Sequence, residues 1–257
     1  MSKRTDGYHD LETIFYPLPL YDILEVTTAT ALSFSTSGLT IEGNTASNLC
    51  IKAYELLQED FPALPPVNIH LHKTIPTGAG LGGGSADGVF TLQALNTKYQ
   101  LEIEDEQLLT YAIELGSDCP FFIINQPCFA TSRGELLTRI DLSVETYSFV
   151  LVNPGININT GQMFADITPA APTKSVKDII QQPVETWKKE LINDFEIPVF
   201  TKYPDIRSIK EELYRKGAVY ASMSGSGSTV YGLFKKGSLP SFSFPPHYFV
   251  KTLVGEL

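Results

Sequence analysis

Residues 75–88 read IPTGAGLGGGSADG, and six of them are glycine. Glycine loses more backbone entropy on folding than any other residue, so a folded domain rarely tolerates such a run. A chain retains the run where something approaches the backbone so closely that a Cβ atom would collide with it. The stretch therefore constrains the fold strongly, because the folded protein must bring a close neighbour to this bare backbone.

Two well-known glycine motifs fit the stretch poorly. A Walker A loop, G-x-x-x-x-G-K-[ST], needs a lysine after its last glycine, and this loop has none. Gly78, Gly80 and Gly83 satisfy the dinucleotide pattern G-x-G-x-x-G, but a Rossmann turn follows its strand directly, whereas residues 73–77 intervene here. The strands expected upstream are also antiparallel. A dinucleotide-binding oxidoreductase is therefore disfavoured.

A phosphate loop of another kind explains the stretch better. It leads into a helix expected from about Ser85, in which Val89, Leu92 and Leu95 recur at helical spacing. Bare backbone N–H groups at a helix N-terminus form an anion site, and the helix dipole adds to it. The Ser85 hydroxyl is then placed to be a ligand of Mg²⁺ carried by a triphosphate. The alternative is a flexible hinge or packing loop, which does not require this order of residues.

Composition narrows the class of protein. The 257 residues are 43% apolar, enough for a sizeable core, and no apolar run reaches the ~18 residues that a membrane span needs. The net charge of −10 argues against a general nucleic-acid binder. The cysteines, Cys50, Cys119 and Cys128, form no C-x-x-C pair and no metal spacing, which predicts buried, reduced thiols rather than a catalytic cysteine. We expect a cytoplasmic protein without membrane or nucleic-acid partners.

The pattern of apolar residues predicts mixed α and β structure in the first part of the chain. Residues 11–38 are rich in β-branched and aromatic residues and indicate antiparallel strands. Residues 47–60 predict a helix with Ser47 as its N-cap, and residues 67–73 alternate as a half-buried strand. A further helix over residues 105–115 should end at Gly116.

A second unit is expected from about residue 146. Residues 147–155 read as a strand, and helices are expected near residues 174–182 and 204–216. Three more strands are expected over residues 218–224, 228–234 and 247–253. Two helices packed against about four strands suggest a ferredoxin-like α+β layer. The sequence therefore predicts two domains, residues 1–145 and residues 146–257.

Several motifs in order resemble one family. PTGAGLGGGSAD resembles the second motif of the galactokinase, homoserine kinase, mevalonate kinase and phosphomevalonate kinase superfamily, and its GLGGGSA form resembles the 4-diphosphocytidyl-2-C-methyl-D-erythritol kinases in particular. RTDGYHDLETIFYPL, LGSDCPFF, NPGININT, NDFE and ASMSGSGSTVYGLF resemble further segments of that family. The matches span residues 4 to 235 in the family's order, which is far more specific than one glycine loop.

The resemblance implies a fold and an activity. The fold would be a two-domain small-molecule kinase, with an N-terminal nucleotide domain like ribosomal protein S5, a C-terminal ferredoxin-like layer and the active site in the cleft between them. The reaction would be ATP-dependent phosphorylation of the 2-hydroxyl of 4-diphosphocytidyl-2-C-methyl-D-erythritol, giving ADP and the 2-phosphate, in the non-mevalonate route to isoprenoid precursors. Mg²⁺ should accompany ATP, and the protein should be a monomer or a homodimer.

The resemblance also assigns catalytic and nucleotide-binding residues. Asp118 would be the base that accepts the proton of the attacking hydroxyl, whereas on sequence alone it is equally well the N-cap of a helix starting near Pro120. Asn48 and Lys73 would lie near adenine and ribose; their simpler interpretations are a helix start and a solvated strand end. The phosphate loop would comprise Pro76, Thr77, Gly78, Ala79, Gly80, Leu81, Gly82, Gly83, Gly84, Ser85 and Ala86.

The substrate site follows from the same resemblance. Tyr8 would stack on the cytosine, His9 would hydrogen-bond its edge, and Phe164 would cover its other face. Thr160 would contact the acceptor near Asp118, and Gly225 and Gly227 would shape the wall that holds the substrate phosphate. The simpler interpretations are core packing for Phe164, a helix cap for Thr160 and an ordinary hairpin connection for residues 224–228.

One feature departs from the family. A first strand with a P-A-K-[IL]-N-L motif, whose lysine points into the family's active site, should precede Gly7 by about 15 residues, and the sequence does not contain it. We therefore expect a start at an internal methionine, a shortened chain or loss of the strand. The alternatives that follow are a nucleotide-binding protein without catalysis, or another kinase of the superfamily acting on homoserine or mevalonate. Residues 7–9, Gly-Tyr-His, speak against the latter because those kinases hold no cytosine.

Overall fold

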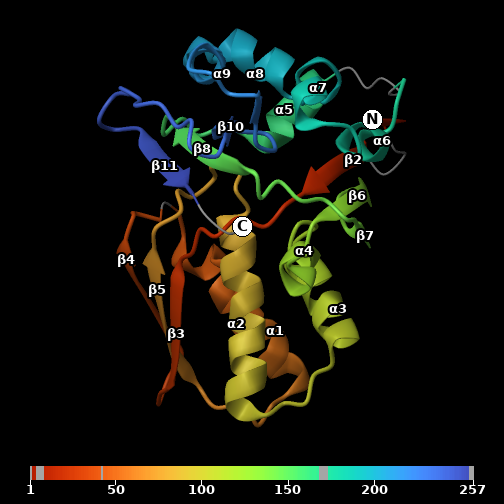
Figure 1. The fold of residues 1–257 in the computed structure, drawn as a ribbon. Coiled ribbons are helices and arrows are strands. Elements are labelled where there is room, and N and C mark those ends of the chain that lie inside the picture. The colour runs from red at the N-terminus through yellow and green to blue at the C-terminus, as the bar shows by residue number, and fades with distance from the viewer. Residues whose placement is uncertain (1, 4–8, 42, 168–172, 255–257) are drawn as a thin grey trace.

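The computed structural model describes residues 2–3, 9–41, 43–167 and 173–254, which form an α+β structure in two halves (Figure 1). The strands of these residues are β1 (Ser2–Lys3), β2 (His9–Phe15), β3 (Ile23–Thr28), β4 (Ser33–Gly38), β5 (Val67–Lys73), β6 (Cys128–Ser132), β7 (Leu136–Arg139), β8 (Tyr147–Asn153), β9 (Tyr220–Met223), β10 (Val230–Lys235) and β11 (Phe249–Leu253). The helices are η1, a short 3-10 helix (Thr45–Ser47), α1 (Leu49–Asp60), α2 (Gly83–Tyr99), α3 (Asp105–Leu115), α4 (Pro120–Ile124), α5 (Thr160–Asp166), α6 (Val176–Ile180), α7 (Val184–Glu190), α8 (Glu196–Lys202) and α9 (Pro204–Arg215).

The first half contains a mixed sheet in the order β3-β5-β4. β5 alternates as predicted, and Val67, Ile69 and Leu71 are buried against α1 and α2, which cover that face (Figure 1). The prediction of antiparallel strands over residues 11–38 is only partly right, because β3 pairs antiparallel with β5 whereas β4 pairs parallel with it. The central strand β5 therefore delivers the chain from the middle of the sheet into the glycine-rich loop.

The helix boundaries correct two details of the sequence analysis. α1 begins after Asn48, whose side-chain oxygen accepts a hydrogen bond from the Cys50 N–H at 2.9 Å. The predicted cap at Ser47 is therefore wrong, since Ser47 ends the preceding 3-10 helix. α2 begins at Gly83, two residues before Ser85, and α3 ends before Gly116 as predicted.

A second sheet, in the order β1-β2-β6-β7, carries the chain between the halves. β2 pairs antiparallel with β6, and β6 forms a hairpin with β7. The sequence analysis assigned no strand to residues 128–139, because their apolar alternation is short. The turn of this hairpin lies beside Asp118, so the missed element contributes to the site described below.

The C-terminal sheet is antiparallel in the order β11-β8-β10-β9. β8 and β10 lie inside and β9 and β11 at the edges, as in a split β-α-β arrangement. The ferredoxin-like prediction needs one correction, because residues 236–248 join β10 to β11 without a helix. The predicted helices correspond to α6 and α9, and α5 is the helix considered after Thr160, whereas α7 and α8 were missed.

Each half has its own apolar cluster, and a third cluster joins the two halves. One cluster lies between the C-terminal sheet and α8 and α9, and another lies between β5, α1 and α2. A third cluster packs Ile14, Tyr16 and Leu18 from the β2 segment against Tyr147 and Phe149 of β8. We propose that the domain boundary near residue 145 falls at the entry to β8, so that this cluster joins residues 1–145 to residues 146–257.

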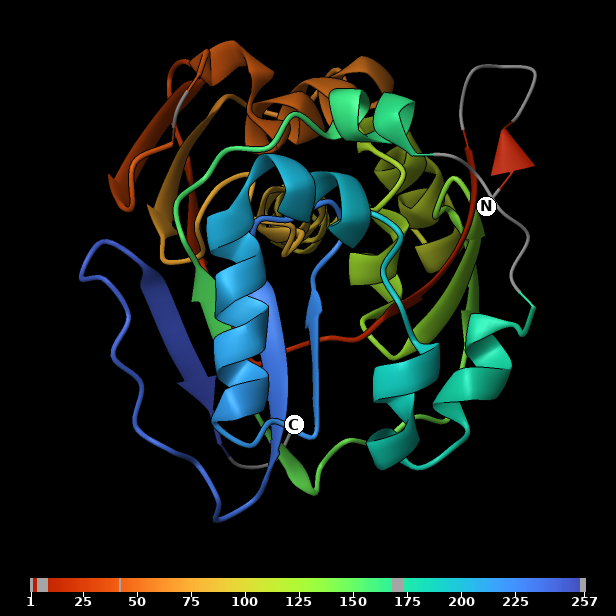
Figure 2. The same ribbon diagram turned by 90° about the horizontal axis from the view of Figure 1, so that it is seen from above.

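The view from above the C-terminal half shows α2 end-on, so the helix axis points toward that half (Figure 2). Contacts of the glycine-rich loop with residues 224–229 identify the near end as the N-terminus of α2. In the described parts of the chain, every helix is too short or too polar to span a bilayer.

Candidate active site

The glycine-rich loop ends in a helix start that is open at its N-terminus. Gly82 is the N-cap of α2 with a φ of +69°, a left-handed conformation that glycine adopts without strain. The Ala86 N–H bonds to the Gly82 carbonyl, so the N–H groups of residues 83–85 precede the first helical hydrogen bond. These donors and the positive end of the helix dipole are what an anion site needs, and the binding of phosphate there stays a prediction.

At Gly80 the glycine-rich loop packs against a second glycine-rich loop, residues 224–228. A Cβ atom on Gly80 would lie 2.3 Å from the Ser224 carbonyl oxygen and 2.8 Å from that of Gly227. The Ser224 hydroxyl donates to the Gly80 carbonyl at 2.7 Å, and the Thr229 N–H donates to the Ala79 carbonyl at 3.1 Å. The phosphate loop is therefore bonded to the β9–β10 connection, and residues 224–228 do more than join two strands.

Asp118 is not a helix cap. Cys119 occupies the N-cap position of α4, and no side chain caps that helix. Among the described residues, the one hydrogen bond of the Asp118 carboxylate comes from the Ser117 hydroxyl at 3.5 Å. The side chain is exposed, yet the protein around it raises the pKa of the carboxyl by desolvation, so water reaches the group from one side while protein encloses the rest. This carboxylate is free to accept a proton.

Asp118 lies close to the start of α2. The Ser85 hydroxyl interacts with the thiol of Cys119, the residue after Asp118. Cys119 is fully buried, and burial raises the pKa of its thiol to about 11, which fits a packing role rather than a nucleophile. On the other side of Asp118, its Oδ1 atom lies 3.4 Å from the position of a Cβ on Gly134, in the β6–β7 turn. The residue after Asp118 therefore contacts the first turn of α2, and the Asp118 carboxylate lies beside the β6–β7 turn.

Lys73 and Asn48 are both engaged with protein groups. The Lys73 ammonium lies 2.5 Å from an Asp22 oxygen and 2.6 Å from an Asp87 oxygen, and its side chain is 2% exposed. The interpretation of Lys73 as a solvated strand end is wrong. Asn48 caps α1 through its side-chain oxygen. Their contacts with adenine and ribose stay predictions.

The predicted substrate residues lie around the second glycine-rich loop. Thr160 bonds to the Ser226 hydroxyl at 2.8 Å, and the cap of α5 is Asn159, so the cap interpretation of Thr160 is wrong. The ring of His9 stacks on Phe164 at 5.4 Å between centroids. Phe164 also packs edge-on against Phe195, so core packing accounts for part of its role. Tyr8 lies outside the described residues.

Gly227 and Gly225 differ in their surroundings. A Cβ on Gly227 would lie 2.8 Å from both Ile158 and Met223 side-chain atoms, so this glycine is needed for packing. A Cβ on Gly225 would meet protein atoms only at 3.7 Å and beyond, and Gly225 is exposed. Their predicted contact with a substrate phosphate stays a prediction.

Two asparagines that hold the second loop carried no assigned role in the sequence analysis. Asn153, at the end of β8, donates to the hydroxyls of Ser228 and Thr229 at 3.2 and 3.0 Å. Asn193 donates to the carbonyls of Met223 and Gly225, both at 2.8 Å. The motifs NPGININT and NDFE contain these residues, but only the folded chain brings them to the loop.

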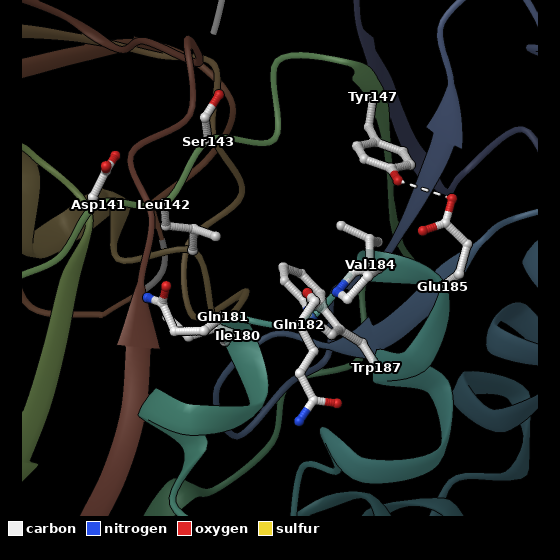
Figure 3. Close-up of a pocket in the computed structure, with 11 residues that line it drawn as sticks. Asp141, Leu142, Ser143, Tyr147, Ile180, Gln181, Gln182, Val184, Glu185 and Trp187 are labelled. Atoms are coloured by element: carbon white, nitrogen blue, oxygen red, sulfur yellow. Dashed lines mark hydrogen bonds between the residues drawn. The ribbon is translucent and has the colours of Figure 1, made fainter.

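A hollow on the C-terminal half lies away from the predicted site. Its volume is about 400 Å³, and it is lined by residues 141–143 and 180–185 together with Tyr147 and Trp187 (Figure 3). The Tyr147 hydroxyl donates to Glu185 at 3.2 Å across one side of it. None of the predicted catalytic or binding residues lines this hollow, so the candidate active site rests on the glycine loops and Asp118.

The comparisons with known proteins identify the family. Residues 48–126 match the GHMP kinases N terminal domain, and residues 175–241 match the GHMP kinases C terminal domain. A protein of Azobacteroides pseudotrichonymphae genomovar. CFP2 named 4-diphosphocytidyl-2-C-methyl-D-erythritol kinase is 49% identical over 253 residues, covering 97% of this chain and 94% of the relative. The chain belongs to the 4-diphosphocytidyl-2-C-methyl-D-erythritol kinase family.

Further members of the family support the assignment. The kinase of the same name from Bacteroides fragilis (strain YCH46) is 52% identical over 236 residues, with 90% of this chain and 86% of the relative covered. A crystal structure of 4-(cytidine 5'-diphospho)-2C-methyl-D-erythritol kinase superposes with a TM-score of 0.79 at 29% identity, covering 98% of this chain and 93% of that one. The chain is therefore an ATP-dependent small-molecule kinase with the two-domain α+β fold of the GHMP kinases.

The buried carboxyl of Asp87, beneath the loop, should make the stability of the protein depend on pH. Burial raises the pKa of Asp87 from 3.8 to about 6, opposed by the nearby Lys73 ammonium. The unfolded chain releases this proton near pH 4, whereas the folded chain keeps it until about pH 6, so the contribution of Asp87 to stability should fall as pH rises from 4 to 6 and stay flat above.

Replacing Asp87 by asparagine should remove that fall. Urea unfolding between pH 4 and 7.5 should show the variant gaining stability relative to the parent by on the order of 2–3 kcal/mol as pH rises. A constant difference between the two proteins across this range would contradict the raised pKa.

Proposed function

We propose that this chain phosphorylates the 2-hydroxyl of 4-diphosphocytidyl-2-C-methyl-D-erythritol, using ATP and releasing ADP and the 2-phosphate. The reaction belongs to the non-mevalonate route to isoprenoid precursors. The observation that carries the proposal is Asp118, whose carboxylate caps no helix and whose neighbour Cys119 contacts Ser85 in the first turn of α2. A proton acceptor close to a phosphate-binding helix start is the arrangement that phosphoryl transfer to an alcohol needs.

The phosphate loop would hold ATP through its backbone. Within residues 76–86, from Pro76 to Ala86, the N–H groups of residues 83–85 lie at the positive end of α2. Because phosphoryl transfer depends mostly on positioning and on stabilising charge, these rigid donors would orient the γ-phosphate toward the acceptor hydroxyl. Asp118 would accept the proton of that hydroxyl as the oxygen attacks phosphorus.

The donor set of the loop fits a magnesium ion held mainly by the nucleotide. Mg²⁺ is usually bound through one or two protein ligands together with substrate phosphates. The described residues contain no group of three His, Cys, Asp or Glu side chains that could hold a metal, whereas the half-buried Ser85 hydroxyl stands in the first turn of α2. Ser85 would therefore be its protein ligand, and Mg²⁺ would neutralise phosphate charge when bound.

The cytidine end of the substrate would bind near His9 and Phe164. The near-parallel stack of these rings, with 21° between their planes, supports Phe164 as a platform for a flat ring. Thr160, Gly225 and Gly227 would flank the path from this platform to Asp118. Three free, buried cysteines fit a reducing compartment, and we propose that the enzyme works in the cytoplasm as a monomer or a homodimer.

Comparing acceptor alcohols tests the substrate assignment. The purified chain should release ADP with 4-diphosphocytidyl-2-C-methyl-D-erythritol and yield a new phosphate monoester by phosphorus NMR. Homoserine and mevalonate should give at least 10²-fold lower kcat/KM, since they present no base to stack on the aromatic platform. Equal turnover of a plain alcohol would contradict the proposed substrate. Saturable ATP binding without ADP release from any acceptor would instead indicate a nucleotide-binding protein without catalysis.

A further inference from the structure

Three buried charged side chains lie beneath the phosphate loop. Lys73 is the last residue of β5, Asp22 precedes β3, and Asp87 is in the second turn of α2. Their side chains are 2%, 5% and 8% exposed, and the single ammonium lies between both carboxylates at 2.5 and 2.6 Å. Asp22, Lys73 and Asp87 form a buried triad.

The buried triad holds the beginning of the loop. The second oxygen of Asp22, Oδ1, accepts hydrogen bonds from the backbone N–H groups of Thr74 and Ile75 at 2.5 and 2.9 Å. The Thr74 hydroxyl also donates to the carbonyl of Tyr21. The first residues after β5 are therefore fixed by direct bonds to the segment that precedes β3.

The buried triad also holds the end of the loop. Asp87 is part of α2, so its bond to the Lys73 ammonium fixes the helix relative to β5. The ammonium passes directly under the helix start, because a Cβ on Gly83 would lie 3.2 Å from Nζ. One cation thus connects the residue before the loop to the helix that follows it.

We propose that Asp22, Lys73 and Asp87 are positioning residues for ATP, which hold both ends of the phosphate loop so that its N–H groups converge on the phosphates. This inference rests on the proposed kinase function. It differs from the predicted contact of Lys73 with the nucleotide, since an ammonium engaged by two buried carboxylates acts through the loop.

Stability alone does not account for the buried triad. Two carboxylates share one ammonium, and burying a charged group carries a desolvation penalty that ion pairing often fails to repay. Within the described parts of the chain, the Cys50 thiol of α1 also faces these residues; burial raises its pKa, and a thiol carries no positive charge that could balance the second carboxylate. Apolar or neutral residues of similar volume would fold about as well, whereas they would not fix both ends of the loop.

A neutral version of the buried triad separates positioning from folding. The variant Asp22→Asn/Lys73→Met/Asp87→Asn removes all three charges while keeping side chains of similar size. We expect its unfolding midpoint to stay near that of the parent, while the Kd of a non-hydrolysable ATP analogue, measured by calorimetry, rises about 10- to 100-fold. The KM of the cytidine-bearing substrate should change less than threefold, because that site, near His9 and Phe164, contains none of the three residues.

Single variants keep the test decisive if the triple variant does not fold. Asp87→Asn retains an acceptor oxygen and should raise the Kd of the ATP analogue about 3- to 10-fold. Lys174→Met, which removes the exposed pair with Glu190, is the matched control and should leave this Kd unchanged. Unchanged Kd values in Asp87→Asn and in any folded triple variant would overturn the inference. Failure of the proposed function would look different, since the parent itself would then bind no ATP or transfer no phosphate.

Discussion

Replacing Asp118 by asparagine is expected to lower kcat by about 10²–10⁴, the usual contribution of a positioned general base. Asparagine has nearly the same size but cannot accept the proton of the attacking hydroxyl. Because Asp118 caps no helix and receives one weak hydrogen bond in the described structure, the variant should keep the parent's unfolding midpoint. ADP release measured by a coupled assay and thermal unfolding by circular dichroism check the two halves of this prediction.

Ser117→Ala is the matched control for this experiment. It removes the one hydrogen bond that the Asp118 carboxylate receives within the described residues, at 3.5 Å, but leaves the carboxylate in place. Its kcat should fall less than tenfold, since a bond of that length is weak. A variant Asp118→Asn that unfolds, while its folded fraction keeps full activity, would show that Asp118 acts in folding and that the base must be sought elsewhere.

The glycine-rich loop before a helix could be predicted, and Asp118 proposed as a catalytic candidate, because each lies in a short contiguous motif. Residues 115–122 contain the catalytic candidate together with the helix end and the proline that position it. β5 and α2 were likewise predicted from period-2 and helical spacing within single segments. What these elements share is that their geometry is set mainly by neighbours in sequence.

The buried triad could not be predicted, because its members are far apart in the chain. Asp22 and Asp87 are ordinary acidic residues in sequence, and only the pairing of β3 with β5 brings Asp22 to Lys73. The same reason explains the missed β6–β7 hairpin and the missed helices α7 and α8. These short elements depend on tertiary packing, which outweighs local propensity.

The glycines of the loop differ in what lies next to them. Gly82 needs its left-handed backbone to start α2, and a Cβ there would lie 2.8 Å from the Phe122 ring. Gly84 has no protein atom within 4 Å of its Cβ position, so its side is open to a ligand. At Gly82 the missing side chain makes room for another part of the protein, whereas at Gly84 the space beside the backbone is open. The sequence pattern alone does not distinguish these two uses of glycine.

Gly80→Ala is expected to be among the most damaging single-methyl changes in the loop. The φ of +74° strains any L side chain by about 1–2 kcal/mol, and the added Cβ would overlap the Ser224 carbonyl at 2.3 Å. Because both partners are backbone, the two glycine-rich loops must separate, at a further cost of about 1–3 kcal/mol. Urea unfolding should therefore show a loss of about 2–5 kcal/mol, and the Kd for ATP should rise at least tenfold as the bond from Ser224 to Gly80 breaks.

Gly84→Ala supplies the contrast within the same run. Its Cβ meets no protein atom within 4 Å, and the residue is helical, so alanine should leave stability unchanged or raise it by up to about 1 kcal/mol. Because the protein itself should be unperturbed, any loss of ATP affinity measured by calorimetry would come from contact between the new methyl group and the bound ATP. Equal stabilities of Gly80→Ala and Gly84→Ala would show that the two glycine-rich loops are not in the close backbone contact on which the assembled site depends.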